Sequence, residues 1–126
     1  MANEMKPSEV MQNFLDYMKG CQKEYQIRMV EVHKHDKRVQ DFLHGLEFAG
    51  NRQERNRIAT QVSQSRKERR KLKDRMQLLE ECAKFYGDKS NKQFFDKLRS
   101  LVTKQKKEEE FLESERIYKP RAGDDV

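Results

Sequence analysis

The sequence predicts an all-α fold of three helices, in which the first two form a long antiparallel hairpin. Three observations support this. Apolar side chains recur at the three- and four-residue spacing of one helix face over most of the 126 residues. Glycine and proline number only 5 and 2, which disfavours a loop-rich or all-β chain. Charged residues make up 40% of the chain and hydrophobic residues 34%, a balance that suits coiled-coil-like helices with narrow apolar seams.

The first predicted helix covers residues 9–48. Pro7 and Ser8 mark its start, and Ser8 has a side chain suited to the N-cap. Apolar residues repeat every seven positions, and a second row beside them is interrupted at Arg28 and His35. The apolar members of the two rows are Met11, Met18, Tyr25, Val32, Val39, Leu46, Phe14, Cys21 and Phe42.

A short turn at residues 49–51 separates the first helix from the second. Gly50 is expected in the left-handed conformation that ends many helices. Asn51 and Glu54 have the spacing of a capping box, which starts a second helix over residues 52–86. Because the turn is so short, the two helices must be antiparallel neighbours.

The turn also predicts which residues of the hairpin face each other. A residue i of the first helix should lie level with about residue 101 − i of the second. Polar residues interrupt both apolar seams at one level: Arg28, His35, Asp36, Ser65, Arg66 and Arg69. One interpretation is a polar network that fixes the register, with Asp36 paired to Arg66 or Arg69. A second interpretation is an anion pocket between the helices, formed by Arg28, His35, Arg66 and Arg69. A third is that these residues lie outside the helix–helix contact and are solvated.

A third helix is predicted over residues 91–116, with Ser90 and Gln93 as its capping box. We expect residues 1–126 to form a single helical domain with frayed ends at residues 1–7 and 119–126. The thin core favours self-association along the apolar seams, and hence a homo-oligomer.

The strongest functional signal is the positive charge of residues 52–75. This segment has 10 basic and 3 acidic residues, a net charge of +7, whereas the whole chain has +6. Such a concentrated patch favours a polyanionic partner, although a charge run is also typical of a solvated helix face. The candidate polyanion-binding residues are Arg55, Arg66, Lys67, Arg69, Arg70, Lys73 and Arg75. A second basic cluster, which could contact a partner, is formed by Arg116, Tyr118, Lys119 and Arg121.

The sequence offers little for catalysis or for membrane insertion. It contains no zinc-protease motif, no glycine-rich phosphate loop and no serine-hydrolase motif. The 2 cysteines form no CxxC pair, and no apolar run approaches the length of a membrane span. We therefore expect a non-enzymatic, cytoplasmic protein without a cofactor or a metal.

Residues 36–47 (DKRVQDFLHGLE), 66–74 (RKERRKLKD) and 115–121 (ERIYKPR) resemble small helical proteins of phages and prophages of Gram-positive, Firmicutes-type bacteria. The resemblance carries no known activity. It implies a phage accessory protein, such as an inhibitor of host defence that binds a nucleic acid, a nucleic-acid–protein complex or a nucleotide signal. The alternative function is that of a structural or adaptor protein that binds another protein through helix–helix contacts.

Overall fold

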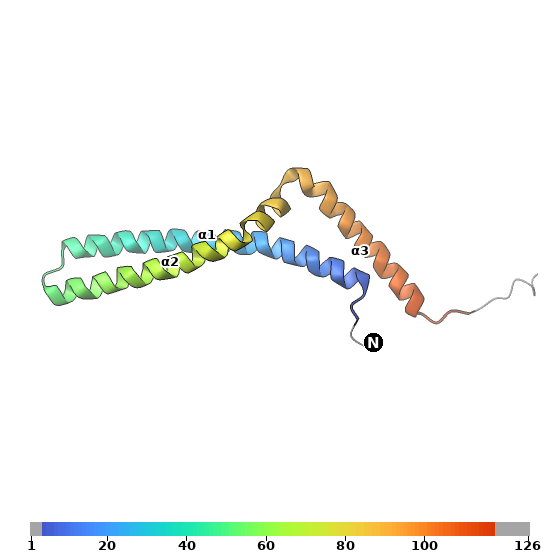
Figure 1. The fold of residues 1–126 in the computed structure, drawn as a ribbon, viewed down its shortest axis with the longest axis horizontal. Helices are drawn as coiled ribbons and strands as arrows, with labels where there is room; N and C mark the ends of the chain where they lie inside the picture. The colour runs from blue at the N-terminus through green and yellow to red at the C-terminus, as the bar shows by residue number, and fades with distance from the viewer. Residues whose placement is uncertain (1–3, 118–126) are drawn as a thin grey trace, which may run out of the picture. The chain divides into compact units, whose positions relative to one another are not determined.

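The computed structural model describes residues 4–117, which are helical over most of their length (Figure 1). The main helices are α1 (Pro7–Glu47), α2 (Arg52–Gly87) and α3 (Lys92–Glu113). A short 3₁₀ turn, η1 (Lys89–Asn91), precedes α3. The predicted all-α fold, with three helices and with α1 and α2 packed together, is confirmed.

The chain divides into two compact units, which are described in turn. One unit is Asp16–Lys92, and the other combines Met1–Leu15 with Gln93–Val126. The expected frayed ends at residues 1–3 and 119–126 lie outside the described residues. Residues 4–6 precede α1, and Pro7 is already its first residue. The single domain expected for residues 1–126 stays a prediction.

The Asp16–Lys92 unit is the antiparallel hairpin of α1 and α2 (Figure 1). Its buried apolar side chains fall on the two seams that the heptad pattern indicates. They are Met18, Cys21, Val32, Ile58, Val62, Met76, Leu79 and Ala83. Leu79 is the most deeply buried of these, with an exposed fraction of 2%. The hairpin is thus held by a narrow line of apolar contacts.

Asn51 caps α2, as the sequence predicts. Its side-chain oxygen accepts a hydrogen bond from the backbone N–H of Glu54 at 2.8 Å. The reciprocal half of the capping box is displaced by one residue, because the Glu54 carboxylate accepts from the N–H of Gly50 at 3.4 Å. The prediction that Gly50 is left-handed is wrong, since no glycine among residues 4–117 has a positive φ.

The end of α1 is closed by a tightened last turn instead of a left-handed residue. The N–H of Phe48 donates to the carbonyl of Gly45 at 3.2 Å, and that of Ala49 donates to Leu46 at 3.4 Å. Bonds of this shorter range satisfy carbonyls that a helix end would leave without a partner.

The expected capping role of Ser90 is also wrong. Ser90 lies inside η1, and Asp88 is the N-cap of that turn, because its carboxylate accepts from the N–H of Ser90 at 2.9 Å and from the Ser90 hydroxyl at 2.8 Å. These bonds lower the pKa of Asp88. A charged carboxylate is a stronger acceptor than a serine hydroxyl, so Ser90 becomes the donor.

In the other unit, the start of α1 is joined to α3 by hydrogen bonds and buried side chains. Leu15, Phe95 and Val102 are buried there. Ser8, expected as the N-cap of the first helix, lies instead in the first turn of α1 and is 2% exposed. Its N–H donates to one oxygen of Glu109 at 3.0 Å, and its hydroxyl donates to the other at 2.5 Å.

This contact should make the stability of the unit depend on pH. The Ser8 hydroxyl, with its N–H, holds the pKa of Glu109 below the ordinary value of 4.5. A lowered folded-state pKa means that the stabilisation is complete above pH 4.5 and is lost as the pH falls through the lower value. We expect Glu109→Gln to lower the urea midpoint at pH 7, and the difference from wild type to become smaller as the pH is lowered from 4.5 to 3.

The neighbouring Glu110→Gln is the matched control for this measurement. Glu110 is exposed on α3 and its carboxylate makes no hydrogen bond or ion pair with a described residue. It should leave the urea midpoint near that of wild type at both pH values. An offset for Glu109→Gln that is as large at pH 3 as at pH 7 would contradict the role of the ionised carboxylate.

Candidate functional site

A set of polar pairs joins α1 and α2 in the middle of the hairpin. The Nε of Arg69 donates to the Asp36 carboxylate at 2.7 Å, which confirms the predicted pairing of Asp36. The Nδ1 of His35 lies 2.9 Å from the hydroxyl of Ser65. His35 and Ser65 are both buried, with exposed fractions of 8% and 7%. A polar pair inside an apolar seam fixes the register, because sliding either helix would leave both groups without partners.

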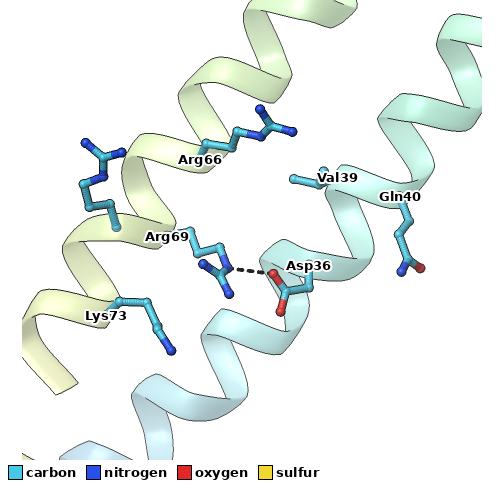
Figure 2. Close-up of a pocket in the computed structure, with 7 residues that line it drawn as sticks. Asp36, Val39, Gln40, Arg66, Arg69 and Lys73 are labelled. Carbon is cyan, nitrogen blue, oxygen red and sulfur yellow. Dashed lines mark hydrogen bonds and ion pairs between the residues drawn. The ribbon is translucent and has the colours of Figure 1, made fainter. Parts of the chain in front are cut away.

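A groove of about 700 Å³ includes the Asp36–Arg69 pair in its lining (Figure 2). Figure 2 shows that α2 contributes Arg66, Arg69 and Lys73 to one wall and that α1 contributes Asp36 and Val39 to the other. The full lining is Asp36, Val39, Gln40, Arg66, Arg69, Arg70 and Lys73. Its four basic residues and one acidic residue give a net charge of 4 − 1 = +3.

Most of this positive charge is not neutralised. Asp36 binds Arg69 through a single N–H, so the rest of that guanidinium stays available. Arg66, Arg70 and Lys73 make no ion pair with any residue of the described range 4–117. The groove therefore combines three free cations with a fourth that an acidic side chain holds in place.

A smaller groove, of about 350 Å³, adjoins the first one. The two share Arg66 and Arg70, and the smaller groove adds Lys67. Its remaining lining is Ala59, Val62 and Ser63. Lys67 also lacks an ion pair within the described part of the chain. The positive surface is thus continuous across both grooves.

The predicted anion pocket of Arg28, His35, Arg66 and Arg69 is not brought together. Arg66 and Arg69 line the 700 Å³ groove, whereas Arg28 and His35 line a separate groove of about 420 Å³. That separate groove also contains Glu31, Glu68, Lys71, Leu72 and Arg75. Its three Lys and Arg side chains face two carboxylates, so it offers a weaker attraction to an anion.

Arg28 is also paired with acidic residues of its own helix, α1. Glu31 accepts from Nη1 of Arg28 at 3.2 Å, and Glu24 lies 3.7 Å from its Nη2. These glutamates stand at the i+3 and i−4 positions, where helix neighbours meet. The Nε of Arg28 is buried without a hydrogen-bond partner among the described residues.

Arg75, a candidate from the sequence, is also neutralised by α1. Its Nε and Nη2 donate to the two oxygens of Glu24 at 2.8 and 3.1 Å. The hydrogen bond with Arg75 is the main cause of the lowered pKa of Glu24. Because Arg75 is bound to Glu24 within the hairpin, it is a poor candidate for binding an external anion.

Arg55 lines neither basic groove but belongs to the same face of α2. It is exposed and has no ion pair within residues 4–117. It precedes Arg66 by 11 residues and Lys73 by 18, close to three and five turns of helix.

The second basic cluster is described only at Arg116, whose guanidinium lies 5.3 Å from the ring centre of Phe111. The other members, Tyr118, Lys119 and Arg121, lie outside the described residues.

Gln40 is the groove residue that the sequence did not indicate. Helical spacing could have indicated it, because Val39 and Gln40 follow Asp36 by three and four residues and so share its face of α1.

Within residues 4–117, no three His, Cys, Asp or Glu side chains come together as a potential metal site. No helix in this range has the length and hydropathy that crossing a membrane requires.

Comparisons with protein-family models, with curated proteins and with solved structures find no match to this chain.

Proposed function

We propose that the protein is a non-enzymatic binding protein that holds a polyanion in the groove of Arg66, Arg69, Arg70 and Lys73. The observation that carries the proposal is that three of these cations, on one helix face, have no acidic partner within residues 4–117. A solvated face would be expected to have acidic neighbours balancing such charges, as Glu24 balances Arg75.

The chemistry of the groove suits phosphate groups. Arginine presents a planar fork of N–H donors that matches two phosphate oxygens, and three of the four cations are arginines. The Asp36 contact restrains the Arg69 side chain, which lowers the entropy lost on binding. Released counterions would supply much of the binding free energy.

The adaptor function remains the second candidate, because α3 exposes apolar side chains. Phe94, Leu101 and Leu112 are 50%, 47% and 54% exposed. Their spacings of 7 and 11 residues place them on one face of α3. A helix from another protein could cover such a face. This function predicts no affinity for polyanions, so one binding experiment separates it from the first.

The biological role that we propose follows from the resemblance to phage proteins. A phage accessory protein with this groove could inhibit host defence by occupying a nucleic acid or a nucleic-acid–protein complex on which the defence depends. The polyanion-binding proposal does not depend on this role and is tested separately.

The proposal predicts binding that falls steeply with salt. Three phosphate contacts alone correspond to a slope of about −2.7 in log K against log salt, so affinity should fall at least about 40-fold between 50 and 200 mM salt. Fluorescence anisotropy with a labelled duplex DNA and a labelled single-stranded DNA would measure this. If neither probe binds at 50 mM salt, the proposal is wrong and the adaptor function is favoured.

A further inference from the structure

We infer that the ligand of the basic groove is the phosphate backbone of a duplex nucleic acid, and not a mononucleotide or an unpaired strand. This inference rests on the proposed function and narrows its ligand class. The basic face is the side of α2 that carries Arg55 and the cations of the two adjoining grooves. The inference follows from the length of this face, from the residues that line the grooves, and from the position of all these cations on one helix.

The basic face is much longer than a mononucleotide. The two adjoining grooves share Arg66 and Arg70, and Arg55 extends the same helix face. From Arg55 to Lys73 is 18 residues, or about 27 Å along the helix axis. A duplex rises about 3.4 Å per base pair along its axis, so the length of this face equals that of about eight base pairs.

The grooves contain no aromatic ring on which a nucleobase could stack. Apart from charged residues, they are lined by small aliphatic or polar side chains: Val39, Gln40, Ala59, Val62 and Ser63. Proteins that bind single strands gain much of their affinity from bases stacked on aromatic rings, and no aromatic residue lines either groove. Nucleotide sites usually enclose most of their ligand, whereas the basic face is an exposed side of a helix.

Contacts limited to phosphates carry no sequence information, so binding should be largely independent of sequence.

A duplex suits cations that are held at fixed positions along a rod. All the basic side chains of this face come from α2, so the helix sets their spacing. A duplex carries one negative charge per about 1.7 Å of its axis and is stiff over this length. A flexible single strand has a lower charge density and must be ordered on binding, which costs free energy.

The test compares ligands on the full-length protein at 50 mM salt. The probes are a fluorescein-labelled 16-base-pair DNA duplex and one of its strands, and ATP is the competitor. We expect the duplex to bind at least tenfold more tightly than the strand, and 1 mM ATP to change duplex affinity less than twofold. If the strand binds as tightly as the duplex, or if ATP displaces the duplex, the inference is overturned while the proposed function stands. If neither DNA binds, the proposed function itself fails.

A remote substitution tests the length of the binding face. Arg55→Gln should weaken duplex binding about fivefold at 150 mM salt and reduce the magnitude of the salt slope by about 0.9, the contribution of one phosphate contact. Arg57→Gln is the matched control, because Arg57 lies two residues away and so points to another side of α2. An unchanged affinity for Arg55→Gln would confine the ligand to the grooves and overturn the extended duplex interface.

Discussion

Replacing Arg66, Arg70 and Lys73 together with glutamine is expected to weaken duplex binding about 100-fold at 150 mM salt, since each phosphate contact contributes about fivefold. The three side chains are the cations of the main groove that have no ion-pair partner within residues 4–117. Glutamine keeps a polar side chain and a good helix propensity, so the helix should persist. Anisotropy titrations over a range of salt concentrations would give both the affinity and the slope, and circular dichroism would confirm the fold.

The matched control replaces Lys104, Lys106 and Lys107 of α3 with glutamine. Both triple variants change the formal charge from +6 to 6 − 3 = +3. The α3 lysines are exposed and line neither basic groove. We expect the control to bind within about threefold of wild type. Equal losses in the two variants would show that binding follows net charge, and the groove would then have no special role.

Leu79→Ala is expected to destabilise the hairpin by about 3 kcal/mol. Leu79 is 2% exposed and lies in a narrow apolar seam, where few neighbours can close around the cavity. Domains of this kind have a total stability of about 5–15 kcal/mol, so the loss is a large share of it. Urea unfolding followed by circular dichroism at 25 °C would measure the change.

The adjacent Leu78→Ala is the control for this prediction. Leu78 is 70% exposed, so the same truncation removes little buried surface. Alanine also has the better helix propensity. We expect a change of less than about 0.5 kcal/mol. Similar losses at the two positions would mean that Leu79 does not lie in the packed seam of α1 and α2.

The hairpin and its polar middle could be predicted because short-range rules determine them. Asn51 and the brief turn fix where α2 begins, and the turn then sets which residues of the two helices are level. The bond of His35 to Ser65 and that of Asp36 to Arg69 both follow from this register. Arg66, Arg70 and Lys73, which are candidates from the charge of residues 52–75, line one groove.

Competition between alternative partners could not be predicted in the same way. Arg28 was expected to face an anion with Arg66, but Glu24 and Glu31 of its own helix bind it. Ser8 has the pattern of an N-cap, yet it donates to Glu109, which is 101 residues away. Nothing in the local pattern indicates such a long-range partner. Ser90 likewise does not cap α3, because its hydroxyl donates to the carboxylate of Asp88, which caps the preceding η1 turn.

Because a single helix carries the basic face, the spacing of its cations depends little on movement of α1 relative to α2. Arg55, Arg66, Arg70 and Lys73 keep their spacing through the backbone hydrogen bonds of α2 alone. Breathing of the thin seam between α1 and α2 would therefore leave the pattern of charges intact. Loosening of the hairpin would therefore alter the α1 side of the groove while the spacing of these four cations is kept.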